Sequence, residues 1–272
     1  MPEKQFIDML WTAMMQARLI AAAYAGRVGE LAEDAGANFK IVEEGNSLAA
    51  VLYFRDHTHL AVIGTNDIHD WVDNFSAGQT SYRGMKVHSG FARCAIHLAD
   101  RLEEAGFYAA SAGKPVIVGG HSAGGAIAQL LTVPFKYREV DPREVITFGC
   151  PRVFSPNDAV LYGAFSWEMF RFVLPGDPVP HLPLRKFRAL FGKAEYAHSS
   201  QAMTINDDGD VLAEQSLGFI GKVARFFANA WLYGIVSALS PMGRISAMLD
   251  KHSITRYEAA IRKAIDKRSS DA

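Results

Sequence analysis

Ser122 is the residue whose surroundings most clearly suggest chemistry. It lies in PVIVGGHSAGGAIAQLL (115–131), where a short apolar run leads into Gly-His-Ser-Ala-Gly and then a helix-like segment. This arrangement is typical of a nucleophile elbow, a turn so tight that the residues two before and two after the serine must lack bulky side chains. Gly120 and Gly124 meet that requirement. A glycine-rich turn without chemistry is the alternative interpretation.

Asp177 is the candidate acid. A serine nucleophile needs a base, and the base needs an acid to orient it. In parallel α/β sheets, reactive groups collect on loops that follow the carboxyl ends of strands. The strand-like run MFRFVL (169–174) is followed by PGDPVPHLP, a loop that prolines stiffen around Asp177. A turn-capping role is the alternative for Asp177, and the weaker rivals are Asp158 at a helix start and Asp210 in a turn.

Four histidines must be weighed as the base. His121 adjoins the serine, but its side chain should point away from it. His181 is four residues past Asp177 on the same loop and is expected to support the loop's shape. His198 in EYAHSS and His252 in LDKHSITRYEAAI both fit the chain order serine, acid, histidine. The residues alone leave both of these open.

The surrounding elements predict an α/β fold. Apolar spacing indicates a helix at 3–25, and Gly-Asn and Asp-His separators indicate antiparallel hairpins in the segment that follows it. The strand-like runs of that segment are 38–43, 48–55 and 59–63. Alternation then follows: helix 90–105, strand 115–119, helix 123–132, strand 144–149, helix 157–165 and strand 169–174. Such alternation predicts a parallel sheet with helices on both faces.

Composition excludes several function classes. The 272 residues predict a single domain over 1–272, and the net charge of −1 argues against nucleic-acid binding. The two cysteines are expected to be buried free thiols, and no Cys/His spacing suggests a metal. The first residues lack the pattern of a secretory signal, so a cytoplasmic location is the default expectation. Export without such a signal would leave no trace in the sequence.

Taken together, these motifs resemble the class 3 lipase family of α/β-hydrolases, which includes the secreted fungal triacylglycerol lipases. The resemblance covers about residues 60–255. Five stretches carry it in order: AVIGTNDIHDWVDNF (61–75), VHSGF (87–91), GGHSAGGAIAQL (119–130), ITFGCPRV (146–153) and DPVPHLP (177–183). It implies an α/β-hydrolase fold, a mixed and mostly parallel sheet with helices on both faces and a helical lid or cap.

The resemblance also implies roles for particular residues. The family's base lies late in the chain, in a pattern like Asp-His followed by a tyrosine, so His252 takes that role in DKHSITRY. His198 falls where the family has a structural histidine. The oxyanion hole would be formed by Thr65 and by the backbone N–H of Ala123. Ala123 is itself a departure, because leucine is common at that position, and this difference bears on the acyl pocket.

Two segments could meet lipid. Residues 66–84 occupy the place of the family's lid, and Trp71 and Phe75 would give a short helix there an apolar face. A surface helix packed permanently on the body is the alternative. The stretch 217–250 contains a long uncharged run, interrupted by glycine and proline, which predicts a helical cap or an interfacial insertion rather than a membrane span. Plain core burial is the alternative.

The sequence therefore predicts a serine carboxylic ester hydrolase acting on lipid-like esters, of triacylglycerol lipase type. Ser122, Asp177 and His252 would form its triad, with a small ester or lipid substrate, transient contact with a lipid interface and no cofactor. A short-chain esterase, a phospholipase or an acyltransferase could use the same triad. A hydrolase-fold binding module without turnover is the alternative from another class.

Overall fold

A computed structural model describes residues 1–64, 78–135, 137–183, 186–189, 192–213 and 252–270. The helices are α1 (Glu3–Tyr24), α2 (Val28–Ala35), α4 (Ser89–Glu104), α5 (Phe107–Ser111), α6 (Ala123–Phe135), α7 (Pro156–Gly163), η1 (Val179–His181) and α10 (Ile254–Ser270). The main-sheet strands are β1 (Asn38–Glu44), β2 (Ser47–Tyr53), β3 (Thr58–Ile63), β6 (Pro115–His121), β7 (Asp141–Phe148), β8 (Glu168–Val173), β11 (Ala202–Ile205) and β12 (Val211–Ala213). Two small hairpins pair β4 (Gln79–Tyr82) with β5 (Met85–His88), and β9 (Lys186–Ala189) with β10 (Gly192–Glu195).

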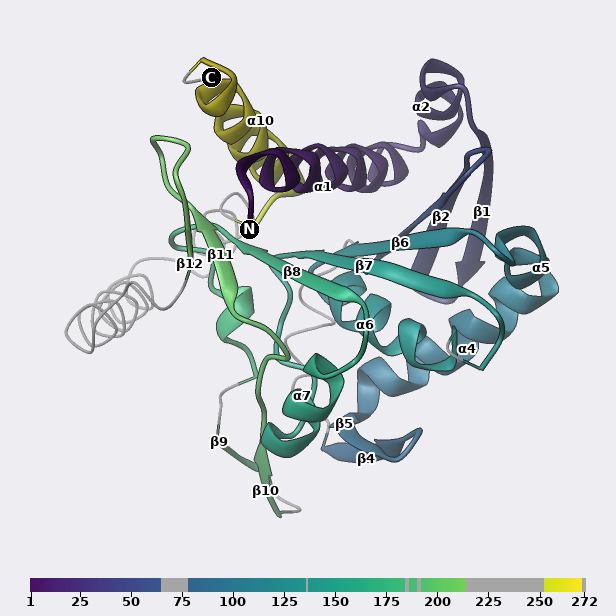
Figure 1. The fold of residues 1–272 in the computed structure, drawn as a ribbon. Coiled ribbons are helices and arrows are strands. Elements are labelled where there is room, and N and C mark those ends of the chain that lie inside the picture. Colours follow the sequence, from purple (N-terminus) through teal and green to yellow (C-terminus); the bar gives the residue numbers. More distant parts are fainter. Residues whose placement is uncertain (65–77, 136, 184–185, 190–191, 214–251, 271–272) are drawn as a thin grey trace.

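The main sheet is mixed, with strand order β1-β2-β3-β6-β7-β8-β11-β12 (Figure 1). The five central strands from β3 to β11 run parallel, while β1, β2 and β12 add antiparallel edges. Parallel neighbours bring the carboxyl ends of their strands to one edge, where loops can converge. The expected α/β architecture is confirmed, and the chain has the α/β-hydrolase fold.

Helices cover both faces of the sheet because its strands are apolar on both sides. On β2, Val51 joins the core that α4 and α6 cover, whereas Ala50 and Leu52 join the core that α1 and α10 cover. Figure 1 shows α1 and α10 above the sheet and α4 and α6 below it. Because both faces are buried, the register of the central strands is fixed, and so is the position in the sheet at which each strand ends.

Helices α1 and α10 bring the two ends of the described chain together. They lie side by side in Figure 1, and Arg268 of α10 contacts α1 twice. Its guanidinium donates to Glu3 at 2.6 Å and lies over the ring of Phe6, 4.3 Å from the centroid. The last turn of α10 is thus tied to the first turn of α1.

The structure confirms the sequence-predicted helices and strands up to residue 174 and adds others. The elements that were not predicted are α2, α5, α10, β4, β5 and β9 to β12. Within the candidate lid 66–84, residues 79–82 form β4, and 66–77 lie outside the described residues. The candidate cap 217–250 also lies outside them. In the described ranges, no helix is both long and apolar enough to cross a membrane. Both cysteines are free, with Cys150 buried and Cys94 half-buried.

Candidate active site

Ser122 occupies the turn between β6 and α6. Its φ is +56°, in the left-handed region that non-glycine residues rarely adopt and that is commonly strained at functional sites. Two backbone hydrogen bonds hold the turn. The Ser122 N–H donates to the carbonyl of Phe148 at 2.9 Å, and the Gly125 N–H donates to the Ser122 carbonyl at 3.0 Å. The serine is therefore fixed between two neighbouring parallel strands.

The glycines around Ser122 are required by close backbone contacts. A Cβ on Gly120 would lie 2.3 Å from the carbonyl oxygen of Gly124. A Cβ on Gly124 would lie 2.1 Å from the carbonyl oxygen of Val62 in β3. Neither contact is possible for a side chain, so the predicted reason for Gly-x-Ser-x-Gly is found in the turn itself.

Asp177 and His252 form a buried pair on the loops after β8 and before α10. The Nδ1–H of His252 donates to Asp177 Oδ2 at 2.8 Å, and the Val179 N–H donates to Asp177 Oδ1 at 2.9 Å. Because Nδ1 carries the proton toward the carboxylate, the neutral ring has its lone pair on Nε2. Among the described residues, His252 Nε2 has no hydrogen-bond partner. It is an available base.

Tyr257 adds a third donor to Asp177. Its O–H donates to Asp177 Oδ2 at 2.6 Å, and its oxygen accepts the Leu174 N–H at 3.3 Å. Burial, and next the negative charge of Asp177, raise the pKa of Tyr257 well above its ordinary value. The phenol therefore stays protonated and keeps the carboxylate in place.

His198 has a different position. Its Nε2–H donates to the carbonyl of Pro180 at 2.7 Å, within the loop that carries Asp177. Burial, followed by the charges of Arg171 and Arg152, lowers the pKa of His198 well below its ordinary value. Arg152 binds the same loop by donating to the carbonyls of His181 and Pro183. His198 and Arg152 thus anchor the acid loop.

The rival acids are engaged elsewhere. Asp158 accepts hydrogen bonds from the Ser155 hydroxyl and the Lys86 N–H at the start of α7. Asp210 accepts from Lys267 Nζ at 2.7 Å in the β11–β12 turn. Of the three carboxylates considered, Asp177 is the one in contact with a histidine.

Residues next to the Ser122 turn contact the Asp177–His252 pair at the carboxyl ends of β6 and β7. His121 precedes Ser122, and its ring stacks on the His252 ring with centroids 4.5 Å apart. Gly149 follows Phe148, the residue that holds the Ser122 N–H, and its Cα faces the His252 ring. Ser122 therefore follows directly on a residue in contact with His252. Thr65, Trp71 and Phe75 lie outside the described residues.

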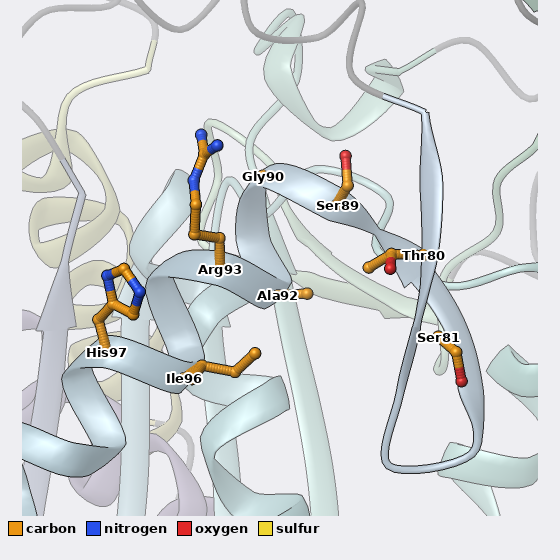
Figure 2. A pocket seen from close by; sticks show the side chains of 8 residues that line it. All are labelled: Thr80, Ser81, Ser89, Gly90, Ala92, Arg93, Ile96 and His97. Atoms are coloured by element: carbon orange, nitrogen blue, oxygen red, sulfur yellow. The ribbon is translucent and has the colours of Figure 1, made fainter.

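A cavity of about 270 Å³ lies elsewhere, between β4 and the first turns of α4 (Figure 2). Figure 2 shows its lining: Thr80, Ser81, Ser89, Gly90, Ala92, Arg93, Ile96 and His97. None of these is a candidate catalytic residue. Within the described part of the chain, no three His, Cys, Asp or Glu residues are arranged to hold a metal ion.

Residues 59–187 match the family model described as Lipase (class 3). Over these residues, slightly less than half of the chain, the sequence is similar to the class 3 lipase family. The match includes β3, the elbow and the acid loop, so the resemblance drawn from the motifs is confirmed. It also confirms the predicted enzyme class, because a class 3 lipase is a serine ester hydrolase. Among curated proteins, no sequence matches the chain.

Solved structures of fungal lipases share the fold of this chain. The lipase from Rhizopus microsporus var. chinensis is similar with a TM-score of 0.59 and 22% identity, over 75% of this chain and 76% of that one. The Rhizomucor miehei lipase in its propeptide complex has a TM-score of 0.58 and 24% identity, over 78% and 72% of the two chains.

Sequence reasoning does not identify three residues of the candidate site. The sequence predicts that the His121 side chain points away from the serine and makes it a poor base, and the structure shows that its ring contacts His252. The sequence places Gly149 at the end of the predicted strand 144–149 and indicates no further role for it. The predicted helix 3–25 includes Tyr24 without indicating a role for it, and its hydroxyl lies 3.1 Å from His121 Nδ1. The glycine in ITFG, directly after a buried strand, was a signal that could have been used.

Proposed function

We propose that the chain hydrolyses lipid-like carboxylic esters through Ser122, His252 and Asp177. The observation that carries this proposal is the buried Asp177–His252 pair. Among the described residues, His252 Nε2 has no hydrogen-bond partner, and its ring stacks on the residue before Ser122. A histidine oriented by a carboxylate beside a serine on a strained turn is the constellation of serine acyl transfer. Catalytic hydrogen bonds are often longer in the absence of substrate.

In the proposed reaction, Ser122 Oγ attacks the ester carbonyl carbon while His252 Nε2 takes the hydroxyl proton. The tetrahedral intermediate collapses as the imidazolium gives that proton to the departing alcohol, which leaves an acyl-serine. Nε2 then takes a proton from water, and the resulting hydroxide attacks the acyl carbon. Collapse releases the acid and returns the proton to Ser122. Asp177 holds the ring and stabilises the imidazolium in both steps.

The oxyanion would be stabilised by two backbone donors. Ala123 is the first residue of α6, and the first N–H groups of a helix have no partner within it. The N–H of Ala123 and that of Thr65 are the proposed donors, and one such donor is typically worth about 3 kcal/mol of transition-state stabilisation. Gly64 supports this pairing, since a Cβ there would lie 2.6 Å from the Ala123 Cβ.

Two neighbours guide the choice of substrate. One similar structure, 23% identical, is described as a model for interfacial activation from a fungal lipase–inhibitor complex, and another, 21% identical, as a triacylglycerol lipase with a serine protease triad. By analogy, we propose a lipid ester as substrate and residues 66–84, with Trp71 and Phe75, as the lid. Residues 217–250 are the proposed cap or interfacial segment.

The test has two parts. A fluorophosphonate should label the wild type and fail to label Ser122→Ala, which would identify the nucleophile. Hydrolysis should then be compared across p-nitrophenyl esters of increasing chain length and emulsified triglyceride, with a rate that rises once substrate forms an interface. Preference for short soluble esters would replace the lipase assignment with an esterase. No labelling of folded wild-type protein would favour a binding module.

A further inference from the structure

His121 links the nucleophile's own strand to the base. Its ring lies against the His252 ring, with centroids 4.5 Å apart and planes inclined by 29°. Its Nε2 lies 2.6 Å from the backbone carbonyl oxygen of His252, and its Nδ1 lies 3.1 Å from the hydroxyl of Tyr24. His121 therefore contacts both the face of the His252 ring and the backbone that carries it.

We propose that His121, itself held by Tyr24, is a positioning residue that fixes the His252 ring for proton transfer with Ser122. The inference rests on the proposed function, because it concerns how the same base is held. Neither His121 nor Tyr24 exchanges a proton with substrate in this account. They act through His252.

The hydrogen bonds determine the tautomer of His121. A carbonyl oxygen only accepts, so Nε2 carries the proton that is donated to His252. Nδ1 then has the lone pair and accepts the O–H of Tyr24. Burial, and next the proximity of His252, lower the pKa of His121 well below its ordinary value, and burial raises the pKa of Tyr24. Both groups are neutral near pH 7. Tyr24 therefore donates a hydrogen bond to His121, and His121 donates one to the His252 carbonyl.

These contacts restrain the one motion that Asp177 leaves open. Asp177 holds only the Nδ1 edge of His252, so the ring can still turn about that hydrogen bond. The stacked His121 ring closes one face, and Gly149 lies close to the Nδ1–Cε1 side. A turn of the ring would displace Nε2, the atom that must meet the serine proton. Small displacements of this kind reduce the rate of the reaction rather than substrate binding.

Tyr24 brings the positioning contact from outside the elbow. It is the last residue of α1, the helix that packs on the sheet and on α10. Its ring meets the His121 ring edge-on, with centroids 5.8 Å apart. Helix α10 begins two residues after His252. The two packed helices therefore both bear on His252, α10 through the chain and α1 through Tyr24 and His121. The position of His252 thus depends on α1 as well as on the acid loop.

The test compares His121→Leu, His121→Gln and Tyr24→Phe with wild type, using p-nitrophenyl butyrate turnover and the rate of fluorophosphonate labelling. His121→Leu should lower kcat and the labelling rate about tenfold with KM unchanged, since a positioning contact acts on the reacting geometry. His121→Gln keeps an N–H donor where Nε2 lies and should restore most of that loss. Tyr24→Phe should lower kcat about threefold, the effect of one neutral hydrogen bond.

Matched controls come from equivalent buried groups away from the site. His59 is a buried histidine that accepts a hydrogen bond from Gln16, and it lies four residues before the end of β3. Tyr82 is a buried phenol that donates to the carbonyl of Leu130 at 3.1 Å. His59→Leu and Tyr82→Phe should lower the melting temperature as much as the test variants while leaving kcat at the wild-type value.

The outcomes separate this inference from the proposed function. If wild type neither labels nor hydrolyses, both are overturned. If wild type reacts and His121→Leu reacts equally fast, or loses only substrate affinity, the positioning role is wrong and the function stands. Equal kcat losses in the control variants would also overturn it. If His121→Leu fails to fold, Tyr24→Phe decides, and a wild-type kcat in that variant would overturn the proposal.

Discussion

Gly149 and His252 are in direct contact: a Cβ on Gly149 would lie 2.6 Å from His252 Cε1. It would also lie 2.8 Å from Asp177 Oδ2, so the same position touches both members of the buried pair. Gly149 has a φ of +58°, and its N–H donates to the carbonyl of Phe172 in β8. The absence of a side chain at the end of β7 is what leaves room for the base.

Gly149→Ala should therefore abolish most ester hydrolysis. The new methyl group must displace the His252 ring or break its bond to Asp177, and we expect a loss of at least about a hundredfold in kcat. Gly84→Ala is the control, because Gly84 also has a positive φ, +83°, but has nothing within 4 Å of its Cβ position. It should cost only backbone strain, about 1 kcal/mol of unfolding free energy. Similar kcat values for the two variants would contradict the steric explanation.

Ser122→Ala and His252→Ala should each reduce ester hydrolysis by about 10⁴-fold or more, as expected when one member of a triad is removed. His198→Ala should keep most of the activity, because the His198 ring bonds to Pro180 rather than to Asp177. Initial rates on a p-nitrophenyl ester would rank the three variants. The reverse order of the two histidines would show that the base has been wrongly assigned.

Tyr257→Phe should weaken both stability and turnover. The variant removes the O–H donor from Asp177 Oδ2 and leaves the Leu174 N–H without its acceptor. We expect the free energy of unfolding to fall by about 1–3 kcal/mol, as for a buried hydrogen bond to a charged group. Urea unfolding at pH 7, together with kcat, would measure the two effects. An unchanged midpoint would mean that Asp177 is held adequately by Val179 and His252 alone.

Acid should destabilise the fold through histidines that are buried and neutral. Burial, with a smaller contribution from His57, lowers the pKa of His59 to about 3, below the ordinary 6.5. Between these two pKa values His59 binds a proton in the unfolded chain but not in the folded chain. Its contribution to the free energy of unfolding is therefore fully present above pH 6.5 and is lost as the pH falls toward 3. Between pH 7 and pH 5 this one group should cost about 2 kcal/mol.

His59→Leu would isolate that contribution. Urea unfolding at pH 7 and pH 5 measures how much unfolding free energy each protein loses on acidification. The wild type should lose about 2 kcal/mol more than the variant. Equal losses would show that His59 is not responsible. His88, whose pKa burial lowers to about 4, should act in the same direction in both proteins and cancel from the comparison.

The central fold could be predicted because its elements have strong local patterns. The run Pro115–His121 is apolar and short, and the glycines after it allow the close backbone contacts of a tight turn. Helix α10 carries many charges, and the strands around the Asp210 turn are only four and three residues long. Yet Ile254, Tyr257 and Ile261 recur at helical spacing on the buried side of α10, a pattern that could have predicted it.

The site residues could be predicted where a local sequence motif indicates their chemistry. Ser122 and Asp177 lie beside recognisable turns, and resemblance rather than spacing separated His252 from His198. The contacts of His121 could not be predicted, because they depend on Tyr24 and His252, which are 97 and 131 residues away along the chain. A histidine next to a nucleophile can face solvent, core or base, and only tertiary structure distinguishes these.

The pairing of α1 with α10 has a consequence for when the enzyme becomes active during its synthesis. The serine, the acid loop and most of the sheet emerge from the ribosome before His252, and the helix that follows His252 docks on the one made first. A nascent chain can therefore fold much of its core before His252, the proposed base, has been synthesised. Under the proposed function, hydrolysis then requires that α10 has docked on α1.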